Sequence, residues 1–249
     1  MHILIFLIVG TICWLLLILQ PWQLSPERPA NKKHLKILRK GTQAWNEWRR
    51  SSFAQPILNR LPNHQWPLNL RDVDLSQSYC VQTSFEGVDL ESANFSRAIL
   101  YGAKFRDVNL KNANFRHADL RYSDLSGANL EGVDFTETNL EEANLCDANL
   151  KKATFRRSNL YKANLVKATL IASYIQGTNL REARLSGADI SNAWIGDDRS
   201  EPTLSNPQTN CMGTNFRGAN FKNASFDESV DLSTADLRDA IMPDGNVHL

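Results

Sequence analysis

Large apolar side chains recur at every fifth position of this chain, from Leu70 to Ile195. Each of these positions holds Leu, Ile or Phe, and Cys80 is the one exception. A small residue usually stands two positions earlier, and Asn or Asp often stands between the two. An α-helix repeats its face every 3.6 residues and a β-strand every 2 residues, so a period of five fits neither element. The pattern therefore predicts a coil that changes direction about every five residues and points its large and small residues inward.

The Asn or Asp residue that precedes each large residue is the most regular polar position of the repeat. Asn and Asp side chains bond readily to nearby backbone, so they suit the places where the chain turns. We therefore interpret them as corner residues and not as catalytic bases.

The charges indicate that four such sides close a coil of about 20 residues. Residues 131–147 contain acids and no Lys or Arg, whereas residues 151–167 contain Lys and Arg and no acids. If coils stack at the strand spacing of ~4.8 Å, an offset of one coil brings the two sets together. Exposed ion pairs contribute only ~0–1 kcal/mol each, so we expect these pairs mainly to fix the register between coils. The predicted ion pairs are Glu131 with Lys151, Glu137 with Arg157, Glu142 with Lys162, and Asp147 with Lys167.

The same offset predicts stacks of large side chains in the core. The predicted stacks are Phe95, Phe115, Phe135 and Phe155 on one side of the coil, and Phe85 and Phe105 on the opposite side. The predicted core ladder consists of Leu90, Phe95, Leu110, Phe115, Leu130, Phe135, Leu150 and Phe155.

These motifs resemble those of the pentapeptide-repeat family, in particular its bacterial, cyanobacterial-like members. The family motif, A-(D/N)-L-x-x, is matched at Ala128-Asn129-Leu130, Ala143-Asn144-Leu145, Ala148-Asn149-Leu150 and Ala163-Asn164-Leu165. The resemblance covers more than half of the chain. It implies an all-β solenoid, a right-handed quadrilateral parallel β-helix, and the handedness comes from the family alone. To this solenoid the rest of the sequence adds an N-terminal transmembrane helix and a short capping helix.

The chain divides into eight segments on these patterns. They are a transmembrane helix over 1–20, a proline-rich and basic linker over 21–33, an amphipathic capping helix over 34–50, an irregular lead-in over 51–67, the solenoid over 68–195, an excursion loop over 196–213, the final repeats over 214–242, and a C-terminal turn and tail over 243–249.

Residues 3–19 carry no charge and approach the ~17–25 residues that a membrane span needs. Lys and Arg follow this run and none precedes it, so the positive-inside rule places the solenoid on the cytoplasmic side. The alternative is a cleaved secretory signal, which would export the solenoid. We favour the anchor because no basic residue precedes the apolar run and no small-residue cleavage site follows it.

The segment 34–50 has an amphipathic pattern weakened by Gly41. Its apolar stripe consists of Leu35, Leu38, Trp45 and Trp48. Such a helix can cover the open end of a solenoid, which would otherwise expose unpaired strand edges and core side chains. A basic helix with tryptophan can also lie on an anionic membrane surface. We favour the cap and keep the membrane surface as the alternative.

Residues 196–213 interrupt the repeat with acids, two prolines and Gly213, which predicts an excursion loop. The repeat then resumes in a new phase at Phe216. One inserted residue shifts it again before Leu232.

The remaining chemistry favours a binding role. The formal net charge is +1, and the five histidines and four cysteines form no catalytic or metal-ligand spacing. We therefore predict no enzyme activity, no metal and no cofactor. The Lys and Arg cluster at 151–167 faces acids one coil away, so we expect no nucleic acid partner.

Our functional hypothesis is a non-catalytic, membrane-anchored scaffold that binds an unidentified protein partner. The alternative, raised by the family resemblance, is a DNA-mimicking modulator of a type II topoisomerase. Such a mimic would be strongly acidic, whereas residues 68–195 contain 15 Lys or Arg and 16 Asp or Glu.

Overall fold

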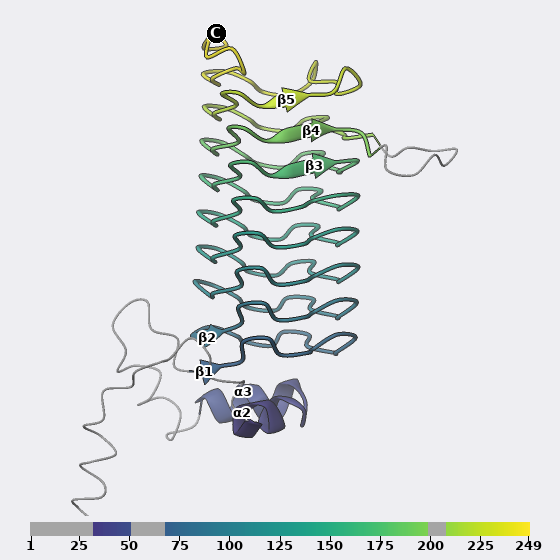
Figure 1. The fold of residues 1–249 in the computed structure, drawn as a ribbon, viewed down its shortest axis with the longest axis vertical. Helices are drawn as coiled ribbons and strands as arrows, with labels where there is room; N and C mark the ends of the chain where they lie inside the picture. Colours follow the sequence, from purple (N-terminus) through teal and green to yellow (C-terminus); the bar gives the residue numbers. More distant parts are fainter. Residues whose placement is uncertain (1–31, 51–67, 199–207) are drawn as a thin grey trace, which may run out of the picture.

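The computed structural model describes residues 32–50, 68–198 and 208–249 of the 249-residue chain. These residues form a long solenoid that stands on two short helices, with the C-terminus at the far end (Figure 1). The predicted transmembrane helix, most of the predicted linker and the predicted lead-in fall at residues 1–31 and 51–67, outside the described residues. In the described part of the chain, no helix is long and apolar enough to cross a membrane.

Each side of the solenoid consists of one β-turn followed by one extended residue. In the first turn, the Val73 N–H donates to the Leu70 carbonyl (3.3 Å), and Asp72 has a φ of 55°. Positive φ at the third residue of such a turn changes the direction of the chain within four residues and so forms one corner of the coil. Asp74 then runs extended and pairs with Asn94 of the next coil. The period of the sequence is therefore the length of one turn plus one extended residue.

Positive φ recurs at this turn position in 21 non-glycine residues of the described chain, with values from 52° to 62°. The conformation costs about 1–3 kcal/mol for a residue that carries a Cβ atom. It also points the N–H toward the next coil, where the Asp72 N–H donates to the Glu91 carbonyl (2.9 Å). The strain at each corner is therefore offset by a backbone hydrogen bond between coils.

Successive coils pair in parallel at the predicted offset of 20 residues. At the lower end, β1 (Leu68–Asn69) pairs with β2 (Val88–Asp89). The offset rises to 31 residues across the predicted loop and to 21 residues in the last coil, which contains the predicted one-residue insertion. One wall near the loop carries a three-stranded parallel sheet that consists of β3 (Tyr174–Gln176), β4 (Trp194–Gly196) and β5 (Ser225–Phe226).

The core contains both predicted phenylalanine stacks. Ring centroids lie 4.8 Å apart for Phe85 and Phe105, 5.0 Å for Phe95 and Phe115, and 5.4 Å for both Phe115 with Phe135 and Phe135 with Phe155. Rings of opposite stacks meet edge to face, as Phe85 and Phe95 do at 5.7 Å. All eight side chains of the predicted core ladder have exposed fractions of 0%.

The Asn and Asp residues of the repeat do not form the corners, which corrects our interpretation. They are the extended residues that pair between coils, and each turn begins one residue later. Asn129 illustrates their role: its Oδ1 accepts the Glu131 N–H at the corner (3.4 Å), and its Nδ2 donates to Asn109 Oδ1 (3.0 Å). Asn149 Nδ2 donates to Asn129 Oδ1 in turn (2.9 Å). These amides therefore form ladders along the walls and steady the corners that follow them.

The predicted single helix over 34–50 is two helices, α2 (Lys32–Leu38) and α3 (Thr42–Arg50). The break lies at Gly41, whose φ of +105° is outside the helical range and is accessible to glycine. The bend allows both helices to contribute to the core, because Leu38 and Trp45 are buried against it. The helix pair covers the lower end of the solenoid (Figure 1).

The repeat resumes earlier than predicted after the excursion. Cys211 is buried in a core position, and Asn210 already pairs with Asn179 of the coil below. The Thr209 hydroxyl donates to the Gly196 carbonyl (2.5 Å), so the two ends of the excursion are joined at its base. The predicted loop of 196–213 is therefore shorter at its C-terminal side, because the repeat has resumed by Asn210.

The C-terminal end folds back on the last coil. Val247 pairs antiparallel with Ile241, and the His248 N–H donates to the Ala240 carbonyl (2.8 Å). The Met242 N–H donates to the Asn246 carbonyl (2.7 Å). The hairpin therefore gives hydrogen-bond partners to backbone groups of the last coil, which in lower coils bond to the coil above.

Replacing Phe115 with Ala should lower the free energy of unfolding by about 3–5 kcal/mol. Its ring contacts Phe95, Phe105 and Phe135, and these contacts would be replaced by a cavity. Phe115→Leu should cost clearly less, because Leu75 fills the equivalent core position two coils below. Hydrogen exchange followed by mass spectrometry in urea would measure the loss coil by coil.

The matched control is Tyr174→Ala, which removes an aromatic ring that is 52% exposed. Equal effects of Phe115→Ala and Tyr174→Ala would contradict the assignment of the stack as the main source of core stability.

Candidate interaction surface

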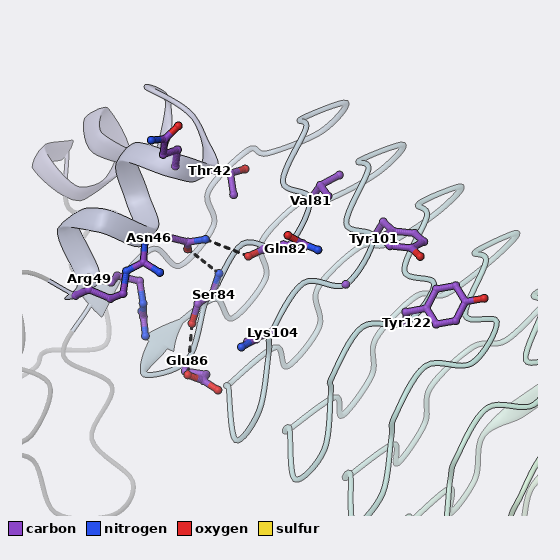
Figure 2. A pocket seen from close by; sticks show the side chains of 13 residues that line it. Thr42, Asn46, Arg49, Val81, Gln82, Ser84, Glu86, Tyr101, Lys104 and Tyr122 are labelled. Atoms are coloured by element: carbon purple, nitrogen blue, oxygen red, sulfur yellow. Dashed lines mark hydrogen bonds between the residues drawn. The ribbon is translucent and has the colours of Figure 1, made fainter.

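The lower end of the solenoid is closed by side chains of α3 that bond to free backbone groups of the first coil. The Ser84 N–H donates to Asn46 Oδ1 (3.0 Å), and Asn46 Nδ2 donates to the Gln82 carbonyl (3.0 Å; Figure 2). The Trp45 indole N–H donates to the Ser84 carbonyl (2.7 Å). In higher coils the groups equivalent to the Ser84 N–H and carbonyl bond to the backbone of the coil below, as the Lys104 N–H does to the Thr83 carbonyl (2.9 Å). The side chains of α3 thus take the place of a preceding coil along this edge.

A groove with a volume of about 900 Å³ lies where α3 meets the outer surface of the first three coils, and we call it the cap groove. Asn46 and Arg49 face it from the helix, and Tyr101 and Tyr122 project from the same corner of two successive coils (Figure 2). Lys104 lies on the wall between them. The groove is partly open to solvent, so a ligand can enter it from the surface.

The cap groove carries an excess of positive charge. Arg49, Arg50 and Lys104 line it, against a single acid, Glu86. Burial lowers the pKa of Arg49, and the nearby Glu86 carboxylate acts against this shift. Arg50 and Lys104 are exposed and form no ion pair within residues 32–50, 68–198 and 208–249. Their charges are therefore available to a ligand.

An apolar and aromatic surface borders the same groove. Tyr79 and Ile99 are 68% and 43% exposed on one wall, next to the corner that carries Tyr101 and Tyr122. The Tyr101 and Tyr122 rings lie 5.1 Å apart, and the Arg121 guanidinium lies 5.7 Å from the Tyr101 ring centroid. The contact between Tyr101 and Tyr122 was not predicted from the sequence.

The groove lies where the Asn and Asp ladder is absent. Four neighbouring ladder positions of the first two coils hold other residues: Tyr79, Ser84, Ile99 and Lys104. At Tyr79 and Ile99 the side chain cannot accept the corner N–H two residues later, which Asn129 does. A hydrogen bond of this kind contributes about 0.5–1.5 kcal/mol. Natural sequences break a local rule mainly at functional sites, so this absence is the signal by which the sequence could have located the groove.

A second group of departures lies beside the excursion. Thr154, Tyr174, Trp194 and Ser225 occupy the ladder positions of this wall. Beside it, the Arg156 Nε donates to Asp198 Oδ2 (2.8 Å), and Arg157 also pairs with this carboxylate. The Asp198 side chain is only 1% exposed, and a buried carboxylate requires such partners. These contacts fix the start of the excursion against the coil.

Of the four predicted ion pairs, only that of Glu137 and Arg157 lies within 4 Å (3.9 Å). Two of the predicted residues pair with other coils: Glu131 with Lys111 (3.4 Å) and Lys162 with Glu182 (3.8 Å). In the described part of the chain no ion pair joins the other predicted partners, which are Glu131 and Lys151, Glu142 and Lys162, and Asp147 and Lys167. Coil stacking brings these charges to one surface, but the flexible side chains select among several neighbours.

The described residues contain no arrangement to which we assign catalysis. No three His, Cys, Asp or Glu side chains of this part of the chain could hold a metal ion together. His117 Nδ1 lies 3.1 Å from Glu137 Oε2, and both side chains are about 40% exposed at the surface. Burial raises the pKa of the Cys211 thiol to about 12 and also raises that of Cys80, so both thiols stay protonated and serve as packing residues.

Two family models match the solenoid. The model described as "Pentapeptide repeat region" matches residues 88–165, and the model described as "Pentapeptide repeats (8 copies)" matches residues 163–195 and 208–244. No curated protein sequence matches the chain.

Several solved structures are similar to this chain. HetL, a pentapeptide repeat protein involved in heterocyst differentiation regulation from the cyanobacterium Nostoc sp. strain PCC 7120, is 25% identical over 73% of this chain and 90% of its own, with a TM-score of 0.27. QnrB1, a plasmid-mediated fluoroquinolone resistance protein, is 17% identical over 70% and 79%, with a TM-score of 0.31. A pentapeptide repeat protein from the Arabidopsis thaliana thylakoid lumen is 28% identical over 50% and 66%, with a TM-score of 0.15. These proteins come from different kinds of source and assign no origin to this chain.

Replacing Asn46 with Ala should destabilise the lower end of the solenoid by about 1–3 kcal/mol. The substitution removes the two hydrogen bonds that Asn46 forms with the first coil: it accepts from the Ser84 N–H and donates to the Gln82 carbonyl. Hydrogen exchange should rise at Ser84 and in α3, while the coils beyond Phe135 keep their protection.

Gln43→Ala is the matched control, because this exposed side chain bonds only to Glu47 within its own helix. The same increase in exchange for both variants would show that Asn46 does not close the first coil.

Proposed function

This chain belongs to the pentapeptide repeat family, and from that premise we propose that it is a non-catalytic scaffold for protein–protein interaction. Members of the family are right-handed β-helix solenoids, generally with structural or interaction roles. The proposal adds that the solenoid is held at a membrane by residues 1–20 and that it faces the cytoplasm.

The observation that carries the scaffold proposal is the regular backbone pairing of the walls. Parallel pairing continues from Asn69 to Ile241, and the large side chains inside are almost fully buried. Outward side chains are therefore held in fixed columns, one strand spacing of ~4.8 Å apart along the axis. Such a surface presents recognition groups at a reduced entropic cost on binding, because the backbone of the walls does not need to be ordered.

The membrane part of the proposal rests on the sequence. Residues 3–19 are uncharged, and the basic residues that follow favour the cytoplasmic side. The helix pair α2 and α3 then places the cap groove at the end of the solenoid that is joined to the proposed anchor.

A DNA-mimicking modulator of a type II topoisomerase is less well supported. A mimic of DNA needs a continuous acidic surface, because the duplex presents one negative charge per ~1.7 Å. On this solenoid acids and bases alternate between coils, as where Arg71 lies within 4 Å of both Asp89 and Glu91. The likeness to QnrB1 concerns the repeat and carries no argument for a shared partner.

The scaffold proposal predicts that photo-crosslinking in the source cells gives discrete products. A photoreactive residue would replace one exposed residue at each corner: Lys152, Arg97, Tyr122 and Arg106. At least one corner should give a defined adduct with a second protein. Absence of any adduct at all four corners under several growth conditions would contradict a scaffold role.

If the solenoid lies on the cytoplasmic side of a membrane, a membrane-impermeant maleimide should reach Cys146 only in permeabilised cells. Cys146 is partly exposed, whereas Cys80 and Cys211 are buried. Burial and the Asp147 carboxylate raise the pKa of the Cys146 thiol, so labelling needs a mildly alkaline buffer. The protein should label only after the cells are permeabilised, and it should stay in the membrane pellet after a carbonate wash.

Cys146→Ser is the control for the labelled site. Labelling in intact cells would place the solenoid outside the cytoplasm, and release by carbonate would contradict the anchor.

A further inference from the structure

We propose that the cap groove binds an extended peptide segment of a partner protein that carries acidic residues together with an aromatic or aliphatic side chain. The inference rests on the proposed scaffold function and names the chemistry of the partner. It is drawn from the charges, the shape and the ladder departures of the first three coils.

The charges of the groove select an acidic ligand. Arg50 and Lys104 are exposed and unpaired within the described residues, and the single acid of the groove, Glu86, lies beside Arg49. Some bases elsewhere on the solenoid pair with acids of neighbouring coils, as Lys111 does with Glu131 (3.4 Å), whereas Lys104 forms no ion pair in the described part of the chain, even with Asp124 of the next coil. A ligand carboxylate would find in the groove three basic side chains, Arg49, Arg50 and Lys104, gathered in one concavity against a single acid.

The rings beside these charges select the second feature of the ligand. Tyr101 and Tyr122 form one continuous aromatic surface, and Ile99 extends it along the wall. Tyrosine and arginine are the residues that most often dominate binding energy at protein interfaces. An aromatic or aliphatic side chain of the ligand can cover this surface while its carboxylates reach Lys104.

The shape of the site favours a peptide over a lipid bilayer. The site is a concavity between a helix and the corners of three coils, and a planar membrane surface would not reach into it (Figure 2). The chain's own segment 51–67 fits the charge poorly, because it contains Arg60 and His64 and no acid. An acidic peptide segment from another protein fits both the concave shape and the positive charge of the groove.

The ladder departures place this surface where the local fold lacks a corner hydrogen bond. Ile99 and Lys104 replace the Asn or Asp that steadies the corner elsewhere, as Asn129 does. Restoring asparagine should return a corner acceptor and strengthen the local fold, while it removes a binding contact. The two roles of these positions can therefore be separated by experiment.

The test uses the purified full chain in phosphatidylcholine nanodiscs and an array of random 12-residue peptides. Peptides bound above background should combine Asp or Glu with Phe, Tyr, Trp or Leu. The strongest binder would then be labelled with fluorescein and titrated by anisotropy. Its affinity should fall as salt is added, since the attraction is electrostatic.

Two substitutions and one control separate binding from folding. Lys104→Asn and Ile99→Asn should each weaken binding about tenfold or more, while the unfolding temperature stays equal or rises. Lys152→Asn removes an exposed lysine from a different corner and should leave binding unchanged. An array without binders, binders that lack acids, or equal loss with Lys152→Asn would overturn the proposal.

Other occupants give distinct results. Loss of peptide binding when phosphatidylglycerol replaces phosphatidylcholine would assign the groove to the membrane, and a dimer that the peptide dissociates would assign it to a second copy. Tighter binding after Phe53→Ser and Trp66→Ser would assign it to the chain's own segment. Each of these results overturns the proposal. Crosslinks at other corners without peptide binding would overturn this inference alone, whereas absence of both would also remove the scaffold function.

Discussion

Backbone pairing between successive coils is the constraint on which the rest of this structure depends. A single coil satisfies few of its own backbone groups, because its extended residues pair only with the coils above and below. The chain can therefore be regular in the middle, but it needs other chemistry at each end. At the lower end the side chains of Trp45 and Asn46 act in place of a coil, and at the upper end a hairpin closed at Val247 does so. The excursion obeys the same constraint, since the chain returns in register at Asn210.

Much of this fold can be predicted from the sequence, because the spacing of the inward side chains equals the length of one turn plus one extended residue. The phenylalanine stacks and the 20-residue coil were predicted correctly, since both depend only on the period. The individual ion pairs were mostly wrong, because Lys and Glu side chains reach either of two coils and Glu131 pairs downward with Lys111. Cys211 was missed because it and the preceding polar residues resemble a loop, although its side chain is buried. The break between α2 and α3 at Gly41 was not predicted, because it depends on the positive φ of Gly41 and the spacing of apolar residues gives no information on φ.

The candidate site was not predicted, although part of its signal is present in the sequence. A ladder position that lacks Asn or Asp gives up a corner hydrogen bond, and most such positions lie beside the helix cap and beside the excursion. Those of the described residues that lie elsewhere are Thr169, Arg184 and Ile241. One departure alone says little, because exposed positions vary freely. Departures at Tyr79, Ile99 and Lys104 gain meaning only when the coil geometry places them on adjoining walls. The spacing of the repeat determines that geometry, but the position of α3 against it required the structure.

The location of the groove follows from the way the solenoid ends. A four-sided coil has nearly flat walls, which offer a ligand contact on one side only. A helix has a round cross-section and meets the corners of the coils at a few points, such as the contact of Asn46 with Gln82. The space between helix and corners is then concave, and a ligand there can be enclosed on two sides. Enclosure on two sides lets a ligand contact the helix and the corners at once, so the end of the rod is a better binding position than its walls.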